Sequence, residues 1–343
     1  MGASRWAVGV EKVWDTARLR RNETPKDFRI ETYLGHGGPH GVVVRGRVLD
    51  DPPPSDAVAG EGVGAAMLRT MRGFVTDELP DVPLRVTVTG TTAEVSSDRE
   101  GYFRVRLQPD DLESPWTNGT VELAAPFRGV TAAHTTQVQV RVPGEGARFG
   151  VISDVDDTIL ETGVQRLGHM LRQTFTGSAL TRTPFEGAPE LYRDLAGEAN
   201  PFFYVSSSPW NLHAFLLGFL HHRDFPLGPV LLRDLLGDGG GREPKHGRIR
   251  EVLDLHPDLP FVLIGDSGEE DPQIYADIVR EYPDRILAVY IREVRLDPGD
   301  GRVEEVAASW DDIGGDAVPF VLVADSDALR ADAEARGLLS GSR

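Results

Sequence analysis

The sequence predicts a small β-sandwich domain followed by an α/β domain built on a parallel sheet. Three observations support this prediction. The length of 343 residues suits about two domains. Apolar and polar residues alternate before residue 143, whereas short apolar runs alternate with helical patterns after residue 147. The segment Pro143-Gly144-Glu145-Gly146 separates the two patterns, and its proline and glycines mark a hinge.

In the first part of the chain, the spacing of apolar residues changes near residue 35 from a helical pattern to the alternation of strands. Residues 1–35 are expected to form a helical segment, because Trp6, Val10 and Val13 have helical spacing among several lysines and arginines. This segment could be an interfacial helix, but an amphipathic helix packed on its own domain is favoured. Residues 36–143 form the predicted β-sandwich, with strands at Val42–Val44, Leu84–Val88, Phe103–Leu107 and Val138–Val142. Residues 65–75 suit an inserted helix, and the prolines at 52–54 mark a loop.

Residues 147–343 form the predicted α/β domain. Its strands are expected at 149–153, 202–205, 230–232, 261–264, 286–291 and 320–323, and its helices at 189–195, 210–221, 246–255 and 272–281. Strands that are apolar throughout, most of them followed by a helix, indicate a parallel sheet covered on both faces. In such sheets a ligand binds beyond the carboxyl ends of the strands.

Composition limits the function. A formal net charge of −18 argues against nucleic acid as a partner. The absence of cysteine excludes disulfides, thiolate catalysis and cysteine-ligated metals, and it fits a reducing cytoplasm. The N-terminus lacks the apolar core of a signal peptide, and no stretch approaches the roughly 20 apolar residues of a membrane span. We therefore expect a cytoplasmic protein, with peripheral membrane contact left open.

Two carboxylates, Asp154 and Asp156, follow the apolar run 149–152. Neighbouring negative charges need a cation or a proton, so this pair predicts a Mg²⁺ site for phosphate chemistry. A calcium loop is disfavoured, because its required sixth-position glycine is Ile159 and its twelfth residue is Gln165.

Further polar residues follow the next strands. Ser206 follows the second strand, Asp266 follows the fourth, and Lys245 lies at the start of the helix that leads into the fourth. All could meet Asp154 at one edge of the sheet. These residues also have structural interpretations that involve no catalysis. Ser208 suits a helix N-cap before Pro209, Lys245 could be a surface lysine, and Asp266 or Asp271 could cap a helix. We prefer catalysis for Ser206 and Lys245, capping for Ser208, and leave Asp271 divided between support of the site and capping.

This ordered set resembles the haloacid dehalogenase superfamily of phosphotransferases, whose domain is Rossmann-like. More narrowly, Asp154-Val155-Asp156-Asp157-Thr158-Ile159, the segment Tyr204–Leu212 and the segment Ile264–Pro272 resemble the catalytic domain of the actin-patch-associated phosphatidate phosphatase family. The likeness spans about Phe149 to Arg292, and it extends loosely to 98–103.

The resemblance implies a role for each matching residue. Asp154 would form an aspartyl-phosphate, and Asp156 would protonate the leaving alkoxide and then deprotonate water. Ser206 and Lys245 would stabilise the transferred phosphate, with Ser207 as a substrate-binding neighbour. The implied metal residues are Asp154, Asp156 through its carbonyl, Asp266 and Asp271, of which Asp271 could instead orient Lys245.

The resemblance also implies a Mg²⁺-dependent phosphatidate phosphatase of lipid metabolism. The alternatives are a phosphatase acting on a phosphoprotein or soluble metabolite, and a non-catalytic binding scaffold. The gap after the first strand, residues 159–201, is expected to hold a short flap near Glu161-Thr162-Gly163 and two helices, and the gap after the second strand leaves no room for a folded lid. We therefore expect an open site that suits a headgroup at a membrane. The partner of the β-sandwich is not specified by the sequence.

Overall fold

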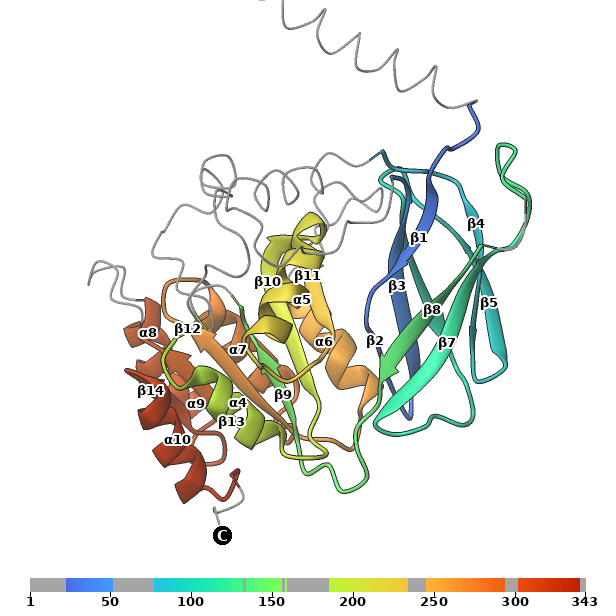
Figure 1. Ribbon diagram of the computed structural model, residues 1–343. Helices are drawn as coiled ribbons and strands as arrows, with labels where there is room; N and C mark the ends of the chain where they lie inside the picture. Colours follow the sequence, from blue (N-terminus) through green and yellow to red (C-terminus); the bar gives the residue numbers. More distant parts are fainter. Residues whose placement is uncertain are drawn as a thin grey trace, which may run out of the picture.

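The computed structural model describes residues 23–51, 77–131, 134–155, 158, 185–233, 245–293 and 302–339. These residues form two sheets that lie beside each other (Figure 1). Several sequence predictions fall outside the described residues: residues 1–22 of the N-terminal helical segment, the helix at 65–75, Asp156, and the short flap near Glu161-Thr162-Gly163. Among the described residues, no helix is long and apolar enough to cross a membrane.

The first sheet, which we call the mixed sheet, has eight strands. Seven run in the order β1-β3-β2-β8-β7-β4-β5, and β6 pairs with β3. The strands are β1 (Phe28–Thr32), β2 (Gly35–Gly38), β3 (Gly41–Asp50), β4 (Pro83–Val88), β5 (Thr91–Ser96), β6 (Tyr102–Leu107), β7 (Trp116–Leu123) and β8 (Thr135–Arg141). Strand β1 lies inside the range 1–35 that the sequence suggested to be helical, because its residues pair antiparallel with β3.

The prediction of a two-sheet sandwich needs correction. Hydrogen bonds link all eight strands into one curled sheet around a single core. The reason is β3, a ten-residue strand that pairs with β1, β2 and β6 along its length and so joins what the sequence pattern would place in separate layers. Alternation along β4 and β6 still places every second residue in the core, as the two-residue period predicted.

The second sheet is parallel throughout, in the order β11-β10-β9-β12-β13-β14. Apolar clusters cover its two faces. The prediction of a parallel sheet is confirmed. Its strands are β9 (Gly150–Ser153), β10 (Phe202–Pro209), β11 (Val230–Arg233), β12 (Phe261–Asp266), β13 (Ile286–Arg292) and β14 (Phe320–Val323). Its helices are α4 (Ala188–Ala196), η2 (Trp210–Leu212), α5 (His213–His222), α6 (Lys245–Leu255), α7 (Asp271–Glu281), α8 (Arg302–Ala308), α9 (Trp310–Ile313) and α10 (Ser326–Ala335).

Strand register brings the polar strand ends together. Ser153 of β9 pairs with Tyr204 of β10 on one side and with Ile264 of β12 on the other. Asp154 follows Ser153 directly, while Ser206 and Asp266 lie two residues beyond the paired positions. All therefore lie at the carboxyl edge of the central strands, where ligands bind in parallel α/β sheets.

Helix α6 joins the two sheets (Figure 1). The carboxylate of Glu251 on α6 accepts hydrogen bonds from Arg45 Nη2 at 2.8 Å to both oxygens, and it contacts His36 Nε2 at 2.9 Å. Arg104 binds the same carboxylate. Burial opposes the charge of Glu251, but His36, Arg45 and Arg104 hold its pKa well below the usual range. One buried carboxylate thus ties three residues of the mixed sheet to the parallel sheet.

Candidate active site

Asp154 lies at the centre of the site and is fully buried. Its backbone N–H donates to Ile264 O at 2.8 Å, which fixes the chain where β9 ends. Burial raises the pKa of Asp154 well above its usual value; Lys245 opposes this, and nearby carboxylates reinforce it. Among the described residues, Asp154 Oδ2 has no hydrogen-bond partner. This oxygen is therefore available to a ligand.

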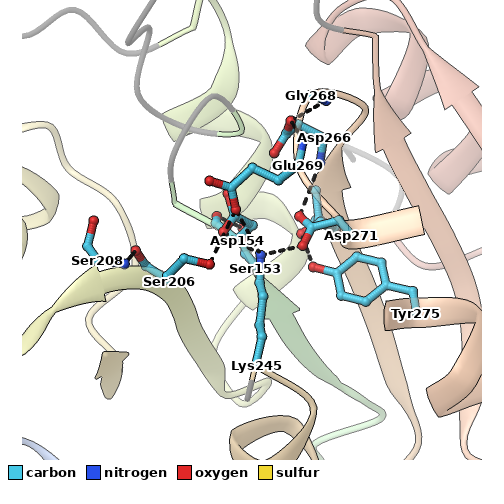
Figure 2. A network of polar contacts seen from close by, with 12 residues as sticks. Ser153, Asp154, Ser206, Ser208, Lys245, Asp266, Gly268, Glu269, Asp271 and Tyr275 are labelled. Atoms are coloured by element: carbon cyan, nitrogen blue, oxygen red, sulfur yellow. Dashed lines mark hydrogen bonds and ion pairs between the residues drawn. The ribbon is translucent and has the colours of Figure 1, made fainter. Parts of the chain in front are cut away.

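Lys245 connects two of the acidic residues. Figure 2 shows its side chain extending from the start of α6 toward Asp154 and Asp271. Nζ donates to Asp154 Oδ1 at 2.6 Å and also to Asp271 Oδ1. Burial opposes the lysine's charge, but Asp154, Asp271 and Glu269 raise its pKa above the usual value. Lys245 is therefore held as a cation inside the acidic cluster rather than at the surface.

Asp271, the first residue of α7, accepts a hydrogen bond from Lys245 and so helps to hold the lysine in place. Its Oδ2 accepts a hydrogen bond from the backbone N–H of Asp266 at 3.3 Å. A Cβ at Gly265 would collide with this Asp271 oxygen, so the close approach requires glycine there. Tyr275, on the same helix, donates to Ile264 O at 2.9 Å. These contacts tie the first turn of α7 to the end of β12.

Asp266 is buried, and its Oδ1 accepts the backbone N–H groups of Gly268 and Glu269 at 2.6 and 3.0 Å. Its Oδ2 has no partner among the residues described. Burial, reinforced by the charges of Asp271 and Glu269, raises the pKa of Asp266 to about 8. Among the described residues, Asp154, Asp266, Glu269 and Asp271 place four carboxylates near Lys245 at this edge of the sheet.

Glu269 is the acidic residue to which sequence reasoning gave no role. Oxygens of Asp154, Glu269 and Asp271 lie within 4.8 Å of one another, a spacing that suits a metal ion. Glu269 Oε2 also lies 3.9 Å from Lys245 Nζ. A signal was present, because the turn after β12 carries two adjacent glutamates, but only the fold shows which of them turns inward. Glu269 is partly buried, whereas Glu270 is exposed.

The acidic cluster fits a hard divalent cation. Asp154 Oδ2 and Asp266 Oδ2 are buried and have no hydrogen-bond partner in the described part of the chain, and both belong to carboxylates, the ligands that Mg²⁺ prefers. The raised pKa values of both groups would be relieved by added positive charge. The donors present are thus of the right kind and in excess of the local positive charge.

The three serines at the end of β10 occupy different positions. Ser206 is buried, and its Oγ accepts the backbone N–H of Ser208 at 2.9 Å. Ser207 is partly buried, with its Oγ 3.5 Å from Glu269 Oε2. The prediction that Ser208 caps the following helix is wrong. Strand β10 continues to Pro209, which itself precedes the short helix η2 without a side-chain cap.

The structure describes some of the other residues near the site and leaves others out. Asp156 and Asp157 lie outside the described residues, whereas Thr158 is buried. Trp210 and His213, which follow β10, are both buried. Behind Asp154, Ser153 Oγ hydrogen-bonds Tyr192 Oη at 2.8 Å, which anchors the end of β9 to α4.

The buried Asp154–Lys245–Asp271 arrangement at a strand end is what the sequence motifs anticipated, and a family comparison supports the same region. Residues 149–293 match the family model of the phosphatidate phosphatase APP1 catalytic domain. The resemblance drawn from the sequence motifs is thereby confirmed for this segment. The matched segment runs from the first strand of the parallel sheet to the residue after β13.

Two curated relatives extend the comparison. Phosphatidate phosphatase APP1 of Saccharomyces cerevisiae is 30% identical over 241 residues, which cover 65% of this chain and 40% of that protein. An uncharacterized protein of Schizosaccharomyces pombe is 30% identical over 156 residues, which cover 43% of this chain and 26% of its own length. The chain thus spans less than half the length of either relative.

Solved structures give weaker likeness. A HAD family hydrolase from Deinococcus radiodurans, with bound phosphate and sodium, aligns with a TM-score of 0.36 and 18% identity over 57% of this chain and 100% of its own. A carbohydrate acetylesterase from Xanthomonas citri aligns with a TM-score of 0.33 and 13% identity over 86% of this chain and 68% of its own. At these TM-scores neither alignment adds to the argument from the site.

Proposed function

We propose that this chain is a Mg²⁺-dependent phosphatidate phosphatase with a Rossmann-like catalytic domain of the haloacid dehalogenase type. The observation that carries the proposal is Asp154: a buried carboxylate at a strand end, with one oxygen paired to Lys245 and the other without a partner among the described residues. The family match over residues 149–293 supports phosphatidate as the substrate class. The proposed location is the cytoplasm, with peripheral contact at the membrane that presents the lipid.

The first half-reaction transfers the phosphoryl group to the enzyme. A carboxylate oxygen of Asp154 attacks phosphorus, the bond to the diacylglycerol oxygen breaks, and an aspartyl-phosphate forms. Asp156 donates the proton that the departing alkoxide needs. Lys245, held as a cation by Asp154 and Asp271, offsets negative charge on the phosphoryl oxygens, and Ser206 and Ser207 would donate hydrogen bonds to them.

The second half-reaction releases inorganic phosphate. Asp156, now a carboxylate, takes a proton from water, which attacks phosphorus and restores the Asp154 carboxylate. Asp266, Asp271 and Asp154, together with the backbone carbonyl of Asp156, would hold Mg²⁺, and Glu269 is a further candidate. The bound ion would screen the charges of the phosphate and of the carboxylates, so that an anionic nucleophile can approach an anionic substrate.

The substrate is tested by phosphate release from a panel. Phosphatidate in vesicles, soluble monoesters and a phosphopeptide are compared with Mg²⁺ and with EDTA. We expect release from vesicular phosphatidate only when Mg²⁺ is present. Equal or faster release from the soluble compounds would assign the chain to a phosphoprotein or metabolite instead, and no release from any compound would favour a binding scaffold.

The nucleophile is tested with Asp154→Asn, against Asp258→Asn as a control at an exposed carboxylate outside the site. We expect Asp154→Asn to abolish turnover with an unchanged circular dichroism spectrum, and Asp258→Asn to retain full activity. Borohydride reduction of acid-quenched enzyme converts an acyl phosphate to an alcohol, which mass spectrometry detects at residue 154. Modification at another residue, or turnover by Asp154→Asn, would disprove the assignment.

A further inference from the structure

Tyr33 belongs to the mixed-sheet part of the chain but packs against the parallel sheet. It lies between β1 and β2, and its backbone N–H donates to Arg45 O of β3 at 3.0 Å. Its side chain is only 5% exposed and is buried in one of the apolar clusters of the parallel sheet. The mixed sheet thus holds the backbone of Tyr33, while the ring packs among residues of the other sheet.

The ring of Tyr33 joins two other buried rings, and we call the three the aromatic stack. The rings of Tyr33 and Trp210 have centroids 4.9 Å apart and an interplanar angle of 5°. The centroid of the His213 ring lies 4.0 Å from that of Tyr33, at an angle of 32°. Burial lowers the pKa of His213 to about 3, so this imidazole is neutral at pH 7. Packed aromatic rings attract each other beyond the apolar area that they bury, so the aromatic stack is a firm contact between the two sheets.

The aromatic stack lies at one end of the segment that carries the three serines. Trp210 begins η2 directly after Pro209, the last residue of β10. The register between β10 and β11 shifts between Val205 and Pro209, which interrupts regular strand pairing across residues 206–208. Where a strand ladder is interrupted, the contacts at the two ends of the irregular segment determine its position. Trp210 provides such a contact at the far end.

The side chain of Ser206 depends on the backbone of this segment. Its Oγ accepts the backbone N–H of Ser208 at 2.9 Å, two residues before Trp210 (Figure 2). A shift of Trp210 would therefore move the backbone group that orients Ser206. A group that stabilises a reacting phosphate must be placed accurately, since a displacement of about 1 Å can cost about 100-fold in rate.

We propose that Tyr33 is a positioning residue for the serine segment, acting through Trp210 to hold Ser206 where it can donate to a phosphoryl oxygen. This inference rests on the proposed function, because it gives Tyr33 a role in the same reaction. It also gives the mixed sheet a part in turnover, since one ring of the aromatic stack comes from that sheet.

Hydrogen–deuterium exchange of the full chain tests the anchor without requiring activity. Tyr33→Leu removes the stacked ring, Tyr33→Met removes it with less loss of buried volume in case the leucine variant does not fold, and Tyr33→Phe keeps it. Phe127→Leu, in the core of the mixed sheet, is the matched control for loss of a buried ring. We expect amides of residues 205–212 to exchange about tenfold faster without the Tyr33 ring and at the wild-type rate in Tyr33→Phe and Phe127→Leu.

Phosphate release from vesicular phosphatidate with Mg²⁺ tests the link to Ser206. We expect Tyr33→Leu to lower kcat about tenfold, and to have no further effect in a Ser206→Ala background, because the ring acts through the serine segment. Tyr33→Phe should retain kcat.

The inference is overturned if ring removal costs the same factor in both backgrounds, or if Tyr33→Leu and Tyr33→Met leave exchange at residues 205–212 unchanged. A purely structural role would give one of these results. Failure of the proposed function would look different, because the wild type itself would then release no phosphate from any compound of the panel.

Discussion

Replacing Glu251 by glutamine tests whether one buried carboxylate holds the two sheets together. Glu251 is 8% exposed and Arg45 is 9% exposed, so Glu251→Gln leaves a buried guanidinium without a counter-charge. Removing one partner of such a pair costs about 3–5 kcal/mol. The side chain of Arg104 is half exposed, and solvent limits its share to about 1 kcal/mol or less. Since glutamine keeps one acceptor oxygen, we expect a loss of about 3 kcal/mol.

The matched control is Glu281→Gln. Glu281 is the last residue of α7, and it forms an exposed ion pair with Arg250, which precedes Glu251 on α6. Arg250 donates to both Glu281 oxygens at 2.7 Å, but both side chains are about 40% exposed. Such a pair contributes about 1 kcal/mol at most. Urea unfolding followed by tryptophan fluorescence and circular dichroism measures both variants. If Glu251→Gln costs no more than Glu281→Gln, the buried network does not hold the sheets together.

The effect of Glu251→Gln should also depend on pH. The pKa of Glu251 is held below its usual range in the folded protein, so the unfolded state takes up a proton first as pH falls. The stabilisation from the carboxylate is therefore fully present above the unfolded pKa of about 4.3 and is lost as pH falls below it. The difference between the wild type and the variant should shrink in that range, and a difference that grows there would contradict this assignment.

Three further predictions concern other parts of the molecule. Burial lowers the pKa of His213 to about 3, so below about pH 6.5 the unfolded state binds more protons than the folded state. Stability should therefore fall by up to about 1.4 kcal/mol for each pH unit as pH decreases. His213→Phe should flatten this slope in urea unfolding measured from pH 7 to pH 4. Glu269→Gln should weaken Mg²⁺ binding in calorimetry while Glu270→Gln, at the exposed neighbour, should not, and equal affinities would remove Glu269 from the metal site. A Cβ at Gly38 would collide with Leu255 O, so Gly38→Ala should lower the melting temperature, whereas Gly218→Ala, in open space on α5, should raise stability by about 0.5–1 kcal/mol.

The parallel sheet was predictable because its signal is local. The central strands β9, β10 and β12 each contain a short apolar run that is buried on both faces, so burial and sequence pattern coincide there. The same locality placed Asp154 and Asp266 at strand ends, from where a parallel sheet must bring them to one edge. Lys245 followed from its place before the fourth strand. The roles of these residues in catalysis stay predictions until turnover is measured.

The features that the sequence pattern did not predict depend on contacts between segments far apart in the chain. The curled mixed sheet differs from a sandwich only in which strands β3 joins, and alternation along a strand does not specify its neighbours. Arg248 belongs to a polar helix start in the sequence, yet it is 3% exposed and lines a cavity between the sheets. Glu251 also belongs to a polar helix pattern. Its partners Arg45 and His36 lie more than 200 residues away in the chain, so only the fold reveals them.

Helix α6 explains why the two sheets should act together. It begins at Lys245, whose Nζ pairs with Asp154, and it carries Glu251 six residues later, about 9 Å along the axis. Between them, Arg248 lies on the same helix and lines a cavity between the two sheets. A helix of 11 residues moves as a rigid unit on this scale, so a tilt that weakens the Glu251 contacts also shifts the lysine beside Asp154. The mixed sheet is therefore a structural support of the candidate active site, and its loss should perturb Lys245 through the helix that carries both Lys245 and Glu251.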